Sequence, residues 1–257
     1  MAWDPAQYDK FRAQRERPAI DLLAAIPAVE ARTIVDLGCG TGALARRLAA
    51  RWPTARITGV DASDAMLAKA AAEPSRIAWV QADIAAWRPD RPVDLIVSNA
   101  ALHWLPDHAC LFPHLMAQLA PGGILAVQMP RNGDAPSHRS IHEIAAHGPW
   151  ADRLRGKLDP APVAPPEFYH DLLAPRSAHL DIWETTYLQV LEGEDPVLEW
   201  VKGTTLLPVA SALADTPDLL DAYTQTYGAR LRAAYSRRSD GTTLFPFRRL
   251  FLVARVP

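Results

Sequence analysis

A glycine-rich turn near the start of the chain constrains the fold more than any other feature. Gly38-Cys39-Gly40-Thr41-Gly42 follows a short β-branched run, 33–37, and precedes a segment with helical spacing of apolar residues, 43–51. Glycines at a strand-to-helix turn let the backbone approach a ligand where side chains would clash, and the helix N-terminus offers free N–H groups. The turn therefore predicts an α/β fold with a ligand at the end of its first strand.

Strand and helix signals alternate after this turn. Further strands are expected at 56–60, 77–81, 93–98 and 123–128, and helices at 63–72 and about 106–119. These strands are apolar runs without strict alternation, which is typical of a parallel sheet covered by helices on both faces. Beyond residue 128 we expect a helix at 138–148, a strand at 179–191, helices at 196–207 and 217–235, and a last strand at 244–256 that bends or bulges near Pro246.

The length and this pattern favour a single domain over residues 1–257. Its core is expected at about 19–129, 179–191 and 244–256. Insertions at about 130–176 and 192–240 would form a cover over a binding site, and residues 1–18 an N-terminal lid.

Composition narrows the class of protein. With 27 basic and 29 acidic side chains, the formal charge of −2 provides no general attraction to nucleic acid or anionic lipid. A basic cluster near the C-terminus, which includes Arg248 and Arg249, is typical of a solvated face but can also line a pocket for an acid. The two cysteines, Cys39 and Cys110, imply no disulfide framework. No signal-peptide or membrane-span pattern is found, so we expect a cytoplasmic protein with a small-molecule substrate and no nucleic-acid or membrane partner.

Asp36, two residues before the first glycine, discriminates between two classes of ligand. Dinucleotide sites carry a Gly-x-Gly-x-x-Gly spacing, which this turn lacks. A carboxylate at this position suits a ligand with an ammonium group better than a pyrophosphate. A nicotinamide-binding domain of the same architecture is the alternative that the fold alone leaves open.

Residues 35–42 resemble motif I of the class I S-adenosylmethionine-dependent methyltransferases. Asp61 ends the second strand, Asp83 follows the third, and Ser98-Asn99-Ala100 ends the fourth, in the order and spacing of that family. The resemblance implies a Rossmann-like α/β fold: a seven-stranded, mostly parallel sheet with helices on both faces and a helical cover. It also implies S-adenosyl-L-methionine as the cofactor, with Asp61 on the ribose hydroxyls and Asp83 on the adenine amino group.

The cofactor residues expected from this resemblance form a long set. They are Tyr8, Arg17, Asp36, Gly38, Cys39, Gly40, Asp61, Ala62, Met66, Asp83, Ile84, Asn99, Ala100 and Trp104. Tyr8 and Trp104 are included because an aromatic face can hold a sulfonium without being methylated, although core packing is the alternative for each. Arg17 is assigned to the carboxylate of the cofactor.

A more specific resemblance, to the trans-aconitate 2-methyltransferase family, extends over nearly the whole chain. It is carried by Trp3-Asp4-Pro5 and by the stretches 103–108, 125–130, 181–187, 199–204 and 249–254. The resemblance implies methyl transfer to one carboxylate of a small polycarboxylic acid such as trans-aconitate, giving a monomethyl ester and S-adenosylhomocysteine. A carboxylate is already ionised at neutral pH, so the reaction requires no strong base.

The substrate site of such an enzyme needs cations, and preferably arginines, to anchor carboxylates. The candidates there are Phe11, Arg15, Gln128, Arg131 and Lys202. His103 and His138 are the catalytic candidates, with a structural role as the alternative for His103. No metal site is expected, because His138 and His142 share a helix face but no third ligand with suitable spacing follows.

The chain departs from the family pattern where the substrate is expected. Leu207 replaces an arginine of the cover helix, Arg131 follows Met129-Pro130 in place of an aspartate, and Arg248 is an added charge. Two alternatives therefore stay open. One is a methyltransferase of the same ancestry that acts on a secondary metabolite, and the other is a non-methyl displacement at the sulfonium by the same fold.

Overall fold

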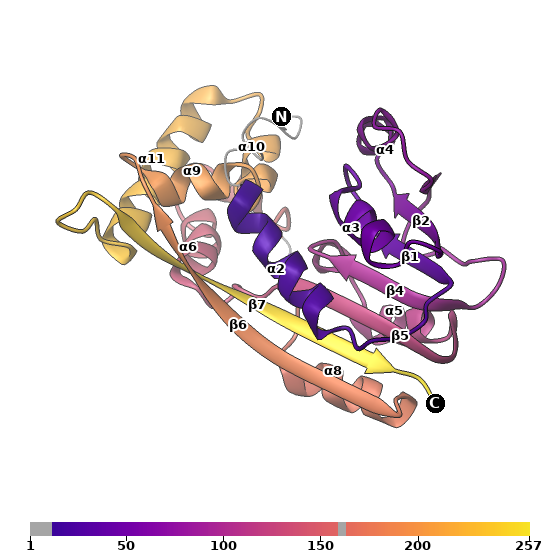
Figure 1. The fold of residues 1–257 in the computed structure, drawn as a ribbon. Coiled ribbons are helices and arrows are strands. Elements are labelled where there is room, and N and C mark those ends of the chain that lie inside the picture. The colour runs from indigo at the N-terminus through magenta and orange to yellow at the C-terminus, as the bar shows by residue number, and fades with distance from the viewer. Residues whose placement is uncertain (1–11, 159–162) are drawn as a thin grey trace. The chain divides into compact units, whose positions relative to one another are not determined.

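The computed structural model describes residues 12–158 and 163–257 (Figure 1). Within this part of the chain, seven strands form one sheet in the order β3-β2-β1-β4-β5-β7-β6. The strands are β1 (Thr33–Leu37), β2 (Arg56–Asp61), β3 (Ala78–Gln81), β4 (Val93–Asn99), β5 (Leu119–Pro130), β6 (His179–Leu191) and β7 (Thr243–Arg255). Strands β1 to β5 pair in parallel, and β7 runs antiparallel to β5. The predicted seven-stranded, mostly parallel sheet is confirmed.

Helices connect most of these strands. In chain order they are α2 (Arg12–Ala25), α3 (Ala43–Arg51), α4 (Asp64–Ala71), the 3₁₀ turn η1 (Leu102–Trp104), α5 (His108–Met116), α6 (Pro136–Ala145), α7 (Ala151–Leu154), α8 (Pro166–Leu173), the 3₁₀ turn η2 (Ala174–Arg176), α9 (Pro196–Lys202), α10 (Leu207–Ala212) and α11 (Pro217–Ala234). Most predicted elements are present, and β1 and β6 have the predicted bounds.

Helices α2 and α7 were not predicted, and three further differences from the predicted helices have local reasons. The helix expected at 106–119 ends at Met116, because Leu119 already pairs with Val93 as the start of β5. The helix expected at 196–207 is divided after Lys202 into α9 and α10. Helix α8 was not predicted, and it begins at the end of a stretch, 159–166, that holds four prolines. Pro166 occupies the first turn, where the missing N–H has no helical partner to lose.

The described residues group into two compact units. The sheet unit contains 17–131, 163–185 and 249–257, and the helical unit contains 12–16, 132–158 and 186–248. Strands β6 and β7 contribute residues to both units. Behaviour as one domain stays a prediction.

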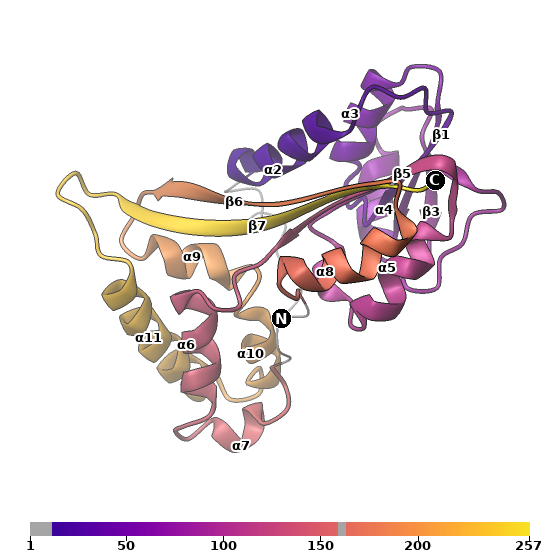
Figure 2. The same cartoon turned by 90° about the horizontal axis from the view of Figure 1, so that it is seen from below.

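The two faces of the sheet unit differ in polarity, because successive side chains of a strand point to opposite faces. On one face, buried residues such as Val35, Ile96 and Val127 pack with Phe112 of α5 and Tyr169 of α8. Figure 2 shows α5 and α8 on one side of these strands and α3 on the other. The face opposite α5 and α8 carries the polar side chains of the candidate site.

The core of the helical unit is rich in aromatic residues. Its buried cluster includes Trp150, Trp200, Tyr223, Tyr227, Phe245 and Phe247. The hydroxyl of Tyr223 donates to the carbonyl oxygen of Ile141 at 2.6 Å, and that of Tyr227 donates to the carbonyl oxygen of Ser137 at 2.7 Å. These bonds connect α11 to α6, so each buried hydroxyl is satisfied by a helix backbone.

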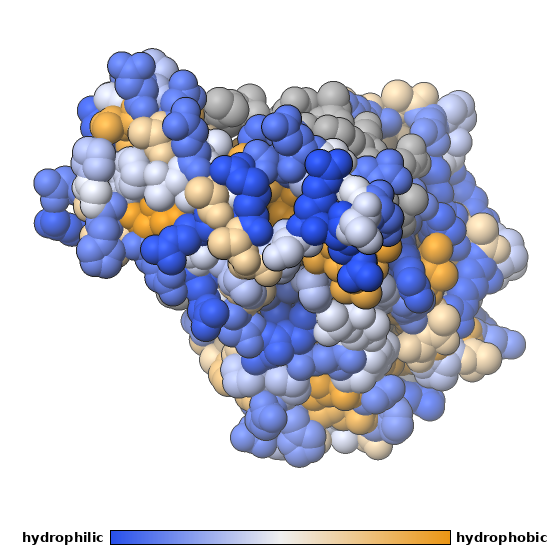
Figure 3. Space-filling view, turned by 90° about the vertical axis from the view of Figure 1, so that its left-hand side faces the viewer, coloured by the Kyte–Doolittle hydropathy of each residue, from blue (hydrophilic) through white to orange (hydrophobic). Residues whose placement is uncertain are grey.

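The face of the molecule seen in Figure 3 is mostly hydrophilic, with hydrophobic side chains in separate patches. Leu188 and Val190 of β6 are among the exposed large hydrophobic residues. None of the described helices is long and apolar enough to cross a membrane.

Candidate active site

The glycine turn between β1 and α3 is shaped by two different requirements. Gly38 has a φ of +74°, and a Cβ atom there would lie 2.1 Å from the Cβ of Ala101, so packing excludes any side chain. Gly40 has a φ of +52°, but a Cβ atom there would meet nothing within 4 Å. The backbone at Gly40 is therefore accessible from open space, as a ligand-binding turn requires.

Asp61, at the end of β2, holds the turn in place. One carboxylate oxygen accepts the N–H of Gly40 at 2.8 Å, and the other accepts the N–H of Ser63 at 2.9 Å. Ser63 in turn caps α4, its hydroxyl accepting the N–H of Met66. These bonds bring Gly40, Asp61, Ala62 and Met66 together. Each oxygen of Asp61 has a second lone pair, so the carboxylate can still accept a ligand hydroxyl.

Asp36 is a fully buried titratable group of the sheet unit. Its side chain is 1% exposed, and within the described residues its Oδ2 atom has no hydrogen-bond partner. Burial raises the pKa of Asp36 to about 7, an effect that the N–H of Ala45 opposes and the charge of Asp61 reinforces. A carboxylate in this state would bind a cation in preference to a neutral group, because the cation compensates for the lost hydration.

Cys39 lies beside Asp36 and Asp61 in the turn. Burial and the two neighbouring carboxylates raise the pKa of its thiol, which leaves it protonated and a poor nucleophile. The sulfur packs against Gly59 of β2, where a Cβ atom would lie 3.0 Å away. These surroundings indicate that Cys39 has a packing role in the turn.

The end of β4 approaches the same turn. Asn99 pairs in register with Gln128 of β5, and the N–H of Ala100 donates to the carbonyl oxygen of Gln128 at 2.9 Å. Ala100 has a φ of +53°, a conformation that costs a non-glycine residue about 1 kcal/mol. The Oδ1 atom of Asn99 is buried and, among the described residues, has no hydrogen-bond partner.

The residues after β3 complete this edge of the sheet. The N–H of Ala82 donates to the carbonyl oxygen of Asp61 at 3.1 Å, which places Asp83 and Ile84 next to β2. Asp83 is exposed, and one of its oxygens accepts the N–H of Ala85 at 2.9 Å. Ile84 is buried against the turn at Gly38.

The catalytic candidate His103 lies in η1, with its ring 4.6 Å from that of the 62% exposed Trp104. His108 of α5 forms a hydrogen bond with the backbone of this turn. Its Nε2 lies 3.0 Å from the carbonyl oxygen of Leu102, which can only accept, so Nδ1 accepts from the hydroxyl of Tyr169 at 2.6 Å. Burial lowers the pKa of His108, which keeps the ring neutral in this arrangement.

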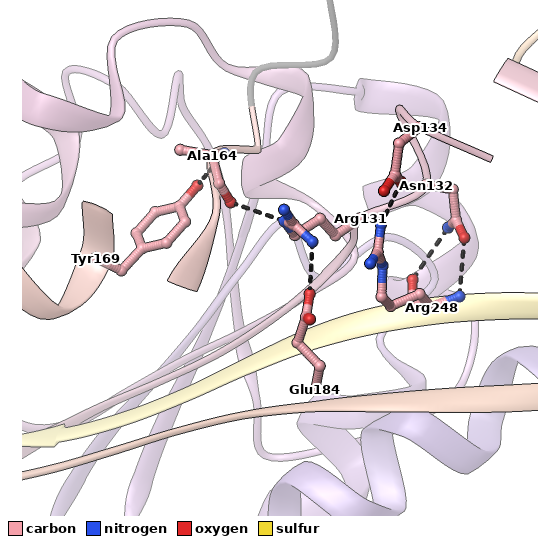
Figure 4. Close-up of polar contacts among 7 residues, drawn as sticks. All are labelled: Arg131, Asn132, Asp134, Ala164, Tyr169, Glu184 and Arg248. Carbon is pink, nitrogen blue, oxygen red and sulfur yellow. Dashed lines mark hydrogen bonds and ion pairs between the residues drawn. The ribbon is translucent and has the colours of Figure 1, made fainter. Parts of the chain in front are cut away.

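Figure 4 shows that Arg131 is engaged by other groups of the sheet unit. Its guanidinium forms an ion pair with Glu184 at 2.9 Å and donates to the carbonyl oxygen of Ala164 at 3.1 Å. The N–H of Ala164 donates to the hydroxyl of Tyr169 at 3.2 Å, so these four residues form one network. The substrate role of Arg131 stays a prediction.

Figure 4 also shows a network within the helical unit. The side chain of Asn132 accepts the N–H of Arg248 at 2.8 Å and donates to its carbonyl oxygen at 3.0 Å. The guanidinium of Arg248 pairs with Asp134. The added charge at Arg248 is therefore matched by a carboxylate of the same unit.

His138 and Lys202 lie in the helical unit. Burial lowers the pKa of His138 to about 4, with His142 reinforcing and Asp134 opposing the shift, so the ring is neutral at pH 7. Its two nitrogens lie 3.1 Å from the hydroxyl of Ser137 and 3.4 Å from that of Thr205. Lys202 is exposed and pairs with Glu199 at 2.5 Å.

The remaining candidates come from the N-terminal segment. Tyr8 and Phe11 lie outside the described residues, and for Arg15 only the backbone in α2 is described. Arg17 is an exposed residue of the same helix. Among the described residues, no three His, Cys, Asp or Glu side chains gather as a metal site would require.

Sequence reasoning assigned no role of its own to Arg249. The residue is 6% exposed, and its guanidinium donates to the side-chain oxygen of Gln128 at 3.4 Å. The available signal was an arginine inside an apolar strand, since a guanidinium in a buried strand needs a polar neighbour. Grouping Arg249 with Arg248 in a basic cluster obscured that signal.

Comparisons with known proteins agree with this geometry. A family model described as a methyltransferase domain matches residues 34–123. The trans-aconitate 2-methyltransferase of Azoarcus sp. (strain BH72) is 51% identical over 252 residues, which cover 98% of each chain. That of Streptomyces coelicolor is 50% identical over 265 residues, covering 99% of this chain and 87% of the relative. The solved YcgJ protein from Bacillus subtilis has a TM-score of 0.59 at 13% identity, covering 93% of this chain and 97% of that one, and shows the fold alone.

Proposed function

The chain belongs to the trans-aconitate 2-methyltransferase family, and from that premise we propose that it methylates one carboxylate of trans-aconitate or a similar small polycarboxylic acid. The products would be the monomethyl ester and S-adenosylhomocysteine. One structural observation supports the proposal most. Within the described residues, Asp36 Oδ2, Asn99 Oδ1 and Gln128 Nε2 are buried polar atoms without hydrogen-bond partners, and a bound ligand would satisfy them.

The residues around the glycine turn suit S-adenosylmethionine. Asp36 and Asn99 offer buried acceptor atoms, which fit the ammonium group of the cofactor better than its carboxylate. Asp61 keeps free lone pairs for two ribose hydroxyls, and the exposed Asp83 is accessible to an adenine amino group. Gly38, Cys39, Gly40, Ala62, Met66, Ile84 and Ala100 would line this site, with Tyr8, Arg17 and Trp104 as its further proposed contacts.

When bound, S-adenosylmethionine supplies an electrophilic methyl group on a sulfonium. The chain itself would mainly orient the acceptor and exclude water, because positioning contributes most to such a displacement. No side chain needs to remove a proton from an ionised carboxylate. His103 would therefore orient the acceptor, and the neutral His138 would act as a hydrogen-bonding group without positive charge.

Among the proposed substrate residues, Gln128 has the placement that supports its role best, because it is buried beside Asn99 with a free donor. Phe11, Arg15, Arg131 and Lys202 complete the proposed set. We also propose that the reaction takes place in the cytoplasm without a nucleic-acid partner, in keeping with the net charge of −2.

Mass spectrometry of the purified protein with S-adenosylmethionine, with and without trans-aconitate, tests the activity. We expect S-adenosylhomocysteine and a monomethyl ester that alkali hydrolyses, both dependent on the acid. S-adenosylhomocysteine formed only with another acceptor would exclude trans-aconitate as the substrate. Breakdown of S-adenosylmethionine into other products, without any acceptor, would exclude methyl transfer itself.

A further inference from the structure

The strand register places four polar residues on one face of the sheet unit. Asp36 pairs with Val97 in β4, so Asn99, two residues further on, points to the same face as Asp36. Asn99 pairs with Gln128, which therefore also points to this face. The fourth residue, Arg249, follows from the pairing of β5 with β7.

Strand β7 extends this face by two residues. Phe251 pairs with Gln128, and Arg249 pairs with Pro130, so both point to the face that carries Gln128. Phe251 is fully buried and stacks on Trp183 of β6, with ring centroids 4.8 Å apart and planes 8° from parallel. The polar groups of Gln128 and Arg249 thus lie on the same face of the sheet as Phe251.

The polar atoms on this face separate into acceptors and donors. The atoms on β1 and β4, Asp36 Oδ2 and Asn99 Oδ1, are acceptors that suit a cation. The groups on β5 and β7 are donors: the Nε2 amide of Gln128 and the guanidinium of Arg249. A ligand pair with a cation on one side and an anion on the other matches this separation.

Arg249 adds a buried positive charge to the donor side. With 6% exposure it has lost most of its hydration, and it donates to the neutral side-chain oxygen of Gln128 at 3.4 Å. A carboxylate suits a guanidinium at such a buried position, because it offers opposite charge and bidentate geometry together. Gln128 could donate to the same carboxylate, since within the described residues its Nε2 has no other partner.

We propose that Arg249 and Gln128 form the anchor for a carboxylate of the acceptor acid, on the β5–β7 side of the site. The assignment rests on the proposed function. It names the residues that would select an anionic substrate. Arg249 thereby becomes a substrate-binding residue, and Gln128 both holds its guanidinium and donates to the acid.

Calorimetric titration of trans-aconitate into the protein saturated with S-adenosylhomocysteine tests this anchor. Arg249→Gln should weaken binding of the acid by about 100-fold or more, and Arg249→Lys by about 10-fold, because lysine keeps the charge without the planar fork. The affinity for S-adenosylhomocysteine should change less than about 3-fold, since the acceptor side of the face is intact. Arg255→Gln is the matched control: it removes an exposed arginine of the same strand and should leave both affinities unchanged.

Gln128→Glu gives a second test if Arg249→Gln does not fold. The new carboxylate would pair with Arg249 inside the protein, so the thermal midpoint should not fall while binding of the acid is lost. Acid binding within about 3-fold of wild type in the variants that fold would overturn the anchor. If the wild-type protein itself binds no polycarboxylate, the proposed function fails as well as the anchor. If the wild-type protein binds the acid and the variants bind it equally well, only the anchor fails.

Discussion

The two units treat their buried polar groups differently. In the sheet unit, Asp36, Asn99 and Gln128 each keep a buried atom for which the described residues supply no partner. In the helical unit, the buried hydroxyls of Tyr223 and Tyr227 donate to backbone carbonyl oxygens at 2.6 and 2.7 Å. Unsatisfied buried groups cost folding free energy, so a fold retains them where a ligand supplies the missing bonds. This difference supports the proposed ligand binding on one face of the sheet unit, and it agrees with a structural role for the aromatic core of the helical unit.

The sharpest test of the sheet unit is a pair of glycine substitutions. Gly38→Ala would place a Cβ atom 2.1 Å from that of Ala101 and should reduce affinity for S-adenosylhomocysteine by about 100-fold or more, or prevent folding. Gly40→Ala meets open space and should cost about 1 kcal/mol of stability through its φ of +52°. Calorimetry and thermal unfolding measure both. Equal effects of the two substitutions would contradict the described turn.

Asp36→Asn should separate binding from stability. The pKa of Asp36 is raised to about 7 from 3.8, so the ligand-free protein loses stability as pH rises between those values. Removing the charge should therefore stabilise the ligand-free protein at pH 8.5, by at most about 4 kcal/mol, and have little effect at pH 4. The same substitution should weaken binding of S-adenosylmethionine by about 10-fold or more. Denaturant unfolding at the two pH values checks the sign, and a stability gain that is independent of pH would exclude an ionised Asp36.

His138→Gln should give the opposite pH dependence in the helical unit. Burial lowers the pKa of His138 to about 4 from 6.5, so its contribution is complete above pH 6.5 and is lost as pH falls towards 4. The substitution should make the protein less sensitive to acid in that window, by about 1–3 kcal/mol, with little change in its sensitivity above pH 7. Unfolding curves at pH 4.5 and 7.5 measure the difference. An unchanged acid response would show that His138 is not buried in its neutral form.

Tyr227→Phe should have the smallest effect of the four. The substitution leaves the carbonyl oxygen of Ser137 without the buried hydroxyl that donates at 2.7 Å, and should cost about 1–2 kcal/mol. The affinity for S-adenosylhomocysteine should not change, because the hydroxyl donates to the backbone of α6, which carries none of the proposed cofactor residues. Thermal unfolding and calorimetry of this single variant test the comparison directly. A loss of cofactor affinity without loss of stability would contradict the structural role assigned to Tyr227.

Local patterns in the sequence were sufficient for the framework of the sheet unit. The bounds of β1 and β6, the turn at Gly38 and the position of Asp61 at the end of β2 follow from residue spacing and turn chemistry over a few positions. The family and its cofactor were identified from the same local motifs. The start of α8 at Pro166 was missed because proline in a first helical turn and proline in a loop have the same local signature.

What the tertiary structure decided depends on residues that are far apart in the sequence. Arg249 is buried against Gln128, 121 positions earlier, only because β7 pairs antiparallel with β5 in one particular register. A shift of that register by one residue would turn Arg249 to the opposite face, and no property of the segment 244–256 alone excludes the shift. The raised pKa of Asp36 likewise follows from burial at the centre of the sheet. The sequence by itself therefore determined the chemical groups and their order along the chain, whereas burial and register decided which of them can act together.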